Sequence, residues 1–137
     1  MFKHIDIIIN TQGDGLYEIT SQVINELEKI NVKEGLCNLF IKHTSASLII
    51  QENADPTAKF DLENWLKKLV PYNDSSFTDT LEGPDDMPSH IKSVLTQTSI
   101  TVPIINEKLS LGMWQGIYLW EHRTAYHRRV INLSVLF

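Results

Sequence analysis

The chain has little of what several common kinds of protein depend on. It has a single cysteine, Cys37, among 137 residues, so neither an internal disulfide nor a cysteine-based zinc cluster is expected within one chain. No apolar run is long enough for a membrane span. Basic residues number 12 against 17 acidic ones, a formal net charge of −5. This balance argues against a broad nucleic-acid or anionic-membrane surface, because such surfaces are basic.

The composition is that of an ordinary globular protein. Hydrophobic residues make up 42% and charged residues 21% of the chain, which excludes a disordered or collagen-like protein. The length fits one domain, residues 1–137, with a single hydrophobic core. The N-terminal segment carries Asp6 inside a short apolar run, which is typical of a strand rather than a signal peptide. We therefore expect a soluble cytoplasmic protein.

The hydrophobic pattern predicts several strands and three helices. Helical spacing of apolar residues begins at Thr20, at Asp55 and, in a shorter segment, at Asp86. The polar residues 72–83 show no periodicity and are expected to form a loop. Because the last four predicted strands follow one another, we expect an α+β domain built on antiparallel sheet. Strands are predicted over residues 5–10, 36–43, 47–51, 99–104, 108–112, 114–122 and 128–137.

No short motif identifies an enzyme class, since the phosphate-binding G-x-x-x-x-G-K-[ST], H-E-x-x-H and G-x-S-x-G patterns are all missing. The unusual feature is three histidines at the ends of predicted elements. His43 ends a strand, His90 lies in the first turn of the third helix, and His122 ends an aromatic strand face. Three such histidines are compatible with a divalent metal site. Each histidine also has an explanation without a metal. His43 could be a buried core histidine, His90 a partly exposed surface histidine, and His122 a part of the sheet core.

Arginines gather near His122. Arg123, Arg128 and Arg129 surround the turn into the final strand, and guanidinium groups suit phosphate or pyrophosphate. The alternative is that these arginines lie in a solvent-exposed turn and bind no ligand. Because neighbouring residues of a strand point to opposite faces, Arg128 and Arg129 are expected to point apart.

Among the carboxylates, Asp55 and Asp86 are explained as helix caps. Glu52 and Glu82 have no such explanation, so they are better candidates for acid–base chemistry or for holding a divalent cation.

Four segments together resemble the YjbQ-like family, whose members are often labelled secondary thiamine-phosphate synthases. They extend in order over nearly the whole chain: His43–Ser47 (HTSAS), Glu52–Pro56 (ENADP), Glu82–Pro88 (EGPDDMP) with His90, and Leu111–Leu119 (LGMWQGIYL) with Glu121–Arg123 (EHR).

The resemblance implies a fold, an assembly and an activity. The fold would be α+β with a β-sandwich-like core, and the assembly a homotrimer with sites near the subunit boundaries. The activity would join a hydroxymethylpyrimidine diphosphate to a thiazole phosphate and release pyrophosphate. A bound divalent metal, zinc or magnesium, is implied as well.

The residues together with the resemblance assign the candidates to three roles. The catalytic candidates are His43, His90, His122, Glu52 and Glu121. The residues expected to contact a small phosphorylated substrate are Thr44, Ser45, Ser47, Asn53, Trp114, Gln115, Arg123 and Arg128. The metal candidates are His43, His90 and His122, with Asp79 as a further possibility.

One departure from the family concerns the metal. This chain has Asp79 where many relatives have a histidine, and a carboxylate ligates hard cations but offers no imidazole. Two other functions stay open from the residues. One is a metal-dependent hydrolase that activates water among His43, His90 and His122, and the other is a non-catalytic metabolite-binding trimer.

Overall fold

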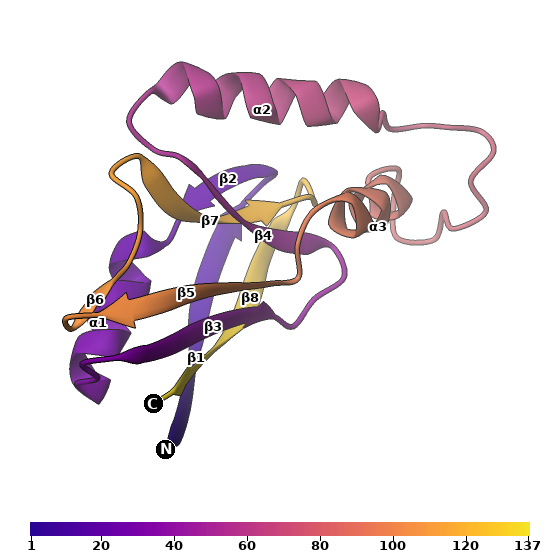
Figure 1. The fold of residues 1–137 in the computed structure, drawn as a ribbon. Coiled ribbons are helices and arrows are strands. Elements are labelled where there is room, and N and C mark those ends of the chain that lie inside the picture. The colour runs from indigo at the N-terminus through magenta and orange to yellow at the C-terminus, as the bar shows by residue number, and fades with distance from the viewer.

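The structure is a computed structural model that describes residues 1–137. Figure 1 shows the arrangement of its eleven elements. In chain order they are β1 (Phe2–Gln12), β2 (Gly15–Glu18), α1 (Thr20–Ile30), β3 (Gly35–Ile41), β4 (Ala46–Glu52), α2 (Pro56–Leu69), α3 (Asp86–Leu95), β5 (Ser99–Ile105), β6 (Lys108–Leu109), β7 (Gln115–Glu121) and β8 (Tyr126–Leu136).

The strands form two antiparallel sheets. The five-stranded sheet has the order β1-β8-β3-β5-β6, and the three-stranded sheet has the order β2-β7-β4. The main core lies between the inner faces of the two sheets and is closed by α1. Alternation places Cys37, Leu39 and Ile41 of β3 in this core, as the sequence predicts. The predicted α+β fold with an antiparallel sheet core and three helices is confirmed.

The helix α2 lies over the three-stranded sheet (Figure 1). A second, smaller core lies between them. Tyr118 and Trp120 of β7 pack there against Leu16, Leu66 and Val70. This packing supports the structural explanation of the aromatic face of β7, because both aromatic side chains are buried within the chain.

The structure differs from the sequence-based expectations at three places. β2 was not predicted, because only four residues separate Asp14 from Ile19. The strand predicted over 108–112 ends at Leu109. In α3 the apolar residues Val94 and Leu95 are exposed, although Ile91 packs against a core. No helix has the length and apolar character needed to cross a membrane.

The β5–β6 hairpin turns at Asn106 and Glu107. Asn106 and Glu107 have φ angles of 52° and 69°, the two positive values of the two-residue turn that best matches the twist of antiparallel strands. Asparagine tolerates this conformation, whereas glutamate is strained in it.

Candidate functional site

The register of two strands separates the candidate residues into two groups. In the β4–β7 pair, Ala46 lies opposite Glu121 and Glu52 lies opposite Gln115. The Thr44–Ser47 segment therefore meets Glu121–Arg123 at one end of the pair, and Glu52–Asn53 meets Trp114–Gln115 at the other. Six residue steps along a strand put the two ends about 20 Å apart. The two groups do not form a single site within one chain.

Two carboxylates and an imidazole converge at the end of the β4–β7 pair that holds Thr44–Ser47. One ligand atom from each of Asp79, Asp86 and His90 lies within 4.8 Å of the other two. His90 Nε2 is 3.4 Å from an Asp86 oxygen and 3.8 Å from an Asp79 oxygen. Its Nδ1 lies 2.8 Å from the carbonyl oxygen of Thr44. Because a carbonyl only accepts, Nδ1 carries the hydrogen, and Nε2 faces the two carboxylates.

The carboxylates of Asp79 and Asp86 lie close to one another. A hydrogen bond to Asp86, followed by desolvation and the charge of Asp86, raises the pKa of Asp79 above its ordinary value. A cation between the two groups would relieve this repulsion. Two carboxylate oxygens with one imidazole nitrogen form a donor set that fits a divalent cation, and hard cations such as Mg²⁺ and Mn²⁺ better than zinc.

Arg123 ties this centre to the end of β7. Its Nε donates to Asp85 Oδ2 at 3.0 Å, its Nη1 to Asp86 Oδ1 at 2.9 Å and its Nη2 to the carbonyl of Glu82 at 2.8 Å. Desolvation alone would raise the pKa of Asp85, but hydrogen bonds from Thr124 and Arg123 outweigh it and the pKa is lowered. Arg123 is therefore neutralised by its carboxylate neighbours.

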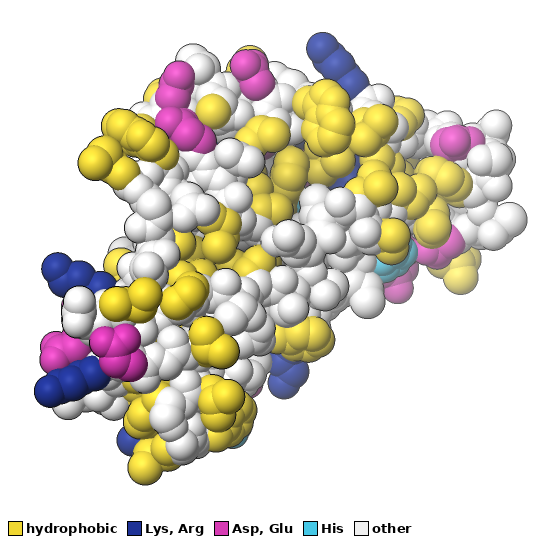
Figure 2. Space-filling model, in the orientation of Figure 1, with side chains coloured by type: hydrophobic (Ala, Val, Ile, Leu, Met, Phe, Trp, Pro, Cys, Tyr) yellow, Lys and Arg dark blue, Asp and Glu magenta, His cyan; other side chains and the backbone are white.

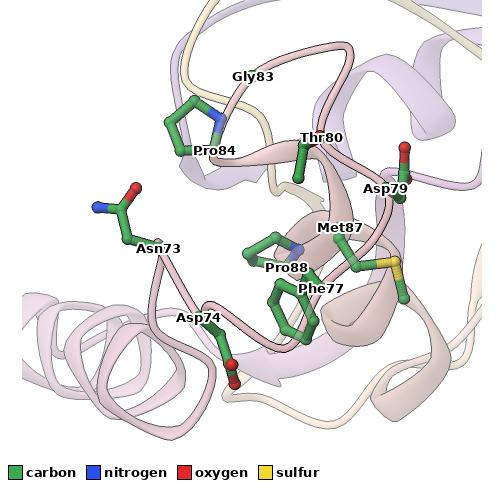
Figure 3. Close-up of a pocket in the computed structure, with 9 residues that line it drawn as sticks. All are labelled: Asn73, Asp74, Phe77, Asp79, Thr80, Gly83, Pro84, Met87 and Pro88. Atoms are coloured by element: carbon green, nitrogen blue, oxygen red, sulfur yellow. The ribbon is translucent and has the colours of Figure 1, made fainter.

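A cavity of about 250 Å³ lies beside Asp79. Figure 3 shows the apolar side chains of Phe77, Met87 and Pro88 gathered between Asp74 and Asp79. The other lining residues are Asn73, Thr80, Gly83 and Pro84. The cavity thus offers an apolar floor with carboxylates at its rim.

The predicted three-histidine metal set does not form within the chain. His43 Nε2 accepts a hydrogen bond from the Val130 backbone N–H at 2.8 Å, and burial followed by the charge of Arg129 lowers its pKa. His122 Nε2 is 2.9 Å from Ser47 Oγ. Each of these Nε2 atoms is engaged elsewhere, whereas His90 Nε2 lies beside two carboxylates.

His122 is a buried, neutral histidine. Burial, together with the charges of Lys92 and Arg129, lowers the pKa of His122 to about 3. Lys92 is 2% exposed, has no carboxylate within 4.0 Å, and holds its ammonium 5.1 Å from the centre of the Tyr72 ring. Lys92 was not predicted from the sequence. The available signal was that Ser89, Lys92 and Ser93 share one face of the third helix, opposite Val94.

The predicted arginine cluster is divided between two roles. Arg129 is buried and binds Glu121, with Nε 2.7 Å from Oε1, and Nη2 also donates to Ser45 Oγ at 3.0 Å. Thr11 donates to the same carboxylate at 2.6 Å. Arg128 is exposed and points away, as alternation predicts. Neither Arg123 nor Arg129 offers an unneutralised positive charge to a phosphate.

At the other end of the β4–β7 pair, which holds Glu52 and Gln115, the candidate residues form hydrogen bonds within the fold. Glu52 accepts from the Asp55 N–H at 3.0 Å, beside the start of α2. Asn53 donates to Glu18 at 3.2 Å, and Gln115 accepts from the Gly112 N–H at 2.7 Å. Trp114 is 58% exposed.

Comparisons with known proteins agree with this fold. The family described as "UPF0047 protein YjbQ-like" matches residues 5–136. UPF0047 protein sll1880 of Synechocystis is 47% identical over 94% of this chain and 88% of its own length. UPF0047 protein YjbQ of Escherichia coli O157:H7 is 40% identical over 96% of both chains. An uncharacterized YjbQ/UPF0047 protein of Clostridium acetobutylicum, solved by crystallography, is 32% identical, with a TM-score of 0.87 over 96% of this chain and 99% of its own. The chain therefore belongs to the YjbQ-like UPF0047 family.

Proposed function

We propose that the chain is a transferase of the thiamine-phosphate synthase type, which uses a divalent cation to bind a small phosphorylated metabolite. The observation that carries the proposal is the convergence of Asp79, Asp86 and His90, with the Nε2 atom of His90 directed at two carboxylates. The cavity beside Asp79 supports it, because the apolar floor suits a flat ring and the carboxylates lie at the rim.

The local charge explains why a cation is needed. Asp79, Glu82, Asp85 and Asp86 surround a single guanidinium, that of Arg123. A diphosphate would be repelled by this group of residues unless a divalent cation came with it. When bound, such an ion stabilises the charge that develops on the departing pyrophosphate.

The chain's own residues then have defined tasks. The thiazole nitrogen forms a bond to the methylene carbon of the pyrimidine as the bond from that carbon to the diphosphate oxygen breaks, and pyrophosphate leaves with the electron pair. Phe77 and Met87 hold the pyrimidine in the cavity and exclude water. Arg123 keeps Asp85 and Asp86 in place, and Thr44 fixes the orientation of His90.

A homotrimer is part of the proposal. It would allow the Trp114 end of one copy to approach the His122 end of another, which a single chain does not allow. Two exposed apolar surfaces support an assembly. Figure 2 shows hydrophobic side chains gathered over α2 and α3. The exposed residues of these helices include Trp65, Leu69 and Val94. On the outer face of the five-stranded sheet, Leu36 and Phe40 are about half exposed.

The test is an assay with both phosphorylated precursors and Mg²⁺. We expect thiamine phosphate and pyrophosphate in equal amounts from the natural sequence, and a rate at least about tenfold lower for His90→Ala. Asp61→Ala, on the exposed side of α2, is the matched control and should keep the full rate. No product above that of His90→Ala would overturn the proposal. Pyrophosphate or phosphate released without the thiazole would instead indicate the hydrolase.

A further inference from the structure

The loop between α2 and α3 is anchored at its two ends. At its start, the Tyr72 hydroxyl donates to an Asp14 carboxylate oxygen at 3.2 Å. At its end, the Glu82 carbonyl accepts from Nη2 of Arg123 at 2.8 Å. Residues 73–81, which lie between these two anchors, are referred to below as the strap.

The strap has few contacts with the rest of the protein. Apart from Asp79, residues 73–81 form hydrogen bonds only among themselves and with Gly83. Leu81 is 98% exposed. Segments with so few buried contacts open at a low cost in free energy. Asn73 and Gly83, which bound the strap, have φ angles of 64° and 103°, and both residue types adopt such angles readily, so these two positions suit hinges.

Asp79 is the residue that joins the strap to α3 by polar contacts. Its carboxylate lies 3.8 Å from His90 Nε2 and close to the carboxylate of Asp86. The one guanidinium nearby, that of Arg123, already binds Asp85 and Asp86. Because two carboxylates repel each other, this contact alone holds the strap weakly. A divalent cation between the carboxylates turns repulsion into attraction, because both then bind the same positive charge.

The strap also forms much of the wall of the cavity of about 250 Å³ beside Asp79. Five of the nine residues that line this cavity belong to the strap. The helix α3 supplies Met87 and Pro88, and Figure 3 shows Phe77 of the strap beside Pro88. Movement of the strap away from α3 would open the cavity to solvent. The cavity is therefore complete only while Asp79 stays in contact with α3.

We propose that the strap is a lid that a divalent cation closes. The cation joins Asp79 of the strap to Asp86 and His90 of α3, and closure places Phe77 over the cavity. The cation and a ring-bearing ligand each stabilise the closed strap, so each raises the affinity of the protein for the other. This inference rests on the cation centre of the proposed function, and it adds that the cation also builds the cavity for the ring.

Cleavage of the strap by chymotrypsin measures how often it opens, because a protease cuts a segment that has been released from the fold. The enzyme cuts after Phe77 and Leu81, and cleavage after the exposed Trp114, before β7, is the internal reference. Mn²⁺ should slow cleavage of the strap at least about fivefold, the lower end of the usual coupling between two sites. Cleavage after Trp114 should keep its rate. Mass spectrometry of the peptides assigns each cut.

Three variants separate the lid from the ion. Asp79→Asn replaces one of the repelling charges with an amide that can donate to Asp86, so its strap should resist cleavage without Mn²⁺ and respond little to it. Asp79→Ala removes the contact, so its strap should be cut rapidly with and without Mn²⁺. Asp74→Asn is the matched control, because the Asp74 carboxylate bonds only Ser76 within the strap. It should respond to Mn²⁺ as the natural protein does.

Calorimetric titration of the same samples with Mn²⁺ separates this inference from the proposed function. If Mn²⁺ binds and cleavage after Phe77 and Leu81 is unchanged, the cation centre stands and the lid is wrong. Equal cleavage of Asp79→Asn and Asp79→Ala without Mn²⁺ would also overturn the lid. Absence of Mn²⁺ binding by the natural protein would overturn both.

Discussion

Arg129 lies against Glu121 in the interior of the protein, with its Nε atom 2.7 Å from Oε1 of the carboxylate. Both side chains are almost completely buried. Desolvation raises the pKa of Glu121, but hydrogen bonds from Arg129, Thr11 and the Arg123 N–H outweigh that effect and the pKa is lowered. The pair therefore stays ionised and joins β7 to β8.

Removing one partner of this pair should be costly. Arg129→Met leaves the Glu121 charge buried without its guanidinium, and we expect the free energy of unfolding to fall by about 3–5 kcal/mol. Urea denaturation monitored by circular dichroism measures the change. Arg128→Met, at the exposed neighbouring position, should change it by less than about 0.5 kcal/mol. Equal effects of the two substitutions would show that the buried pair is not maintained in solution.

His122 should make the protein less stable in acid. The pKa of His122 is about 3 in the folded state, against about 6.5 in an unfolded chain. Below pH 6.5 the unfolded state therefore binds more protons, and stability falls as the pH falls from 6.5 toward 3. At pH 5 this loss is about 2 kcal/mol relative to pH 7.

Urea midpoints at pH 7 and pH 5 measure this loss. His122→Gln retains a group that can bond Ser47 but does not titrate, so the variant should lose about 2 kcal/mol less than the natural protein between the two pH values. The same pH dependence in both proteins would contradict a buried, neutral His122.

The β5–β6 turn offers a stabilising substitution. Glu107 has a φ of 69°, which glycine adopts without strain. We expect Glu107→Gly to raise the free energy of unfolding by about 0.5–1 kcal/mol, because strain relief exceeds the added entropy of the unfolded chain. Asn106→Gly is the control and should have a smaller effect, since asparagine tolerates this conformation. Calorimetric melting curves of the two variants compare these effects.

The sequence predicts the fold well where burial follows a simple period. The alternation of Cys37, Leu39 and Ile41 was enough to place β3, and the Asp55–Pro56 pair was enough to start α2. The sequence did not predict which face of α3 is buried, because that face carries the polar residues Ser89, Lys92 and Ser93. A buried polar face is stabilised by particular partners, such as the Ala46 carbonyl that accepts from Ser93, and no period reveals those partners.

The site was predicted less completely than the fold. The sequence pointed to Asp79 and His90, but it explained Asp86 only as a helix cap. Which candidates meet depends on the register of β4 against β7 and on the path of residues 72–85. Both are set by contacts between residues distant in the chain. The separation of Trp114 from His122 follows from their spacing on one predicted strand, but the residues that meet each of them could not be deduced from spacing.

Titration with Mn²⁺, followed by isothermal calorimetry, tests the proposed cation centre most directly. The natural protein should bind one ion per chain at Asp79, Asp86 and His90. Asp79→Ala should weaken this binding at least about tenfold, since it removes a ligand rather than an outer contact, while Asp61→Ala should leave it unchanged. An affinity that is unaffected by Asp79→Ala, or no binding by the natural protein, would contradict the account.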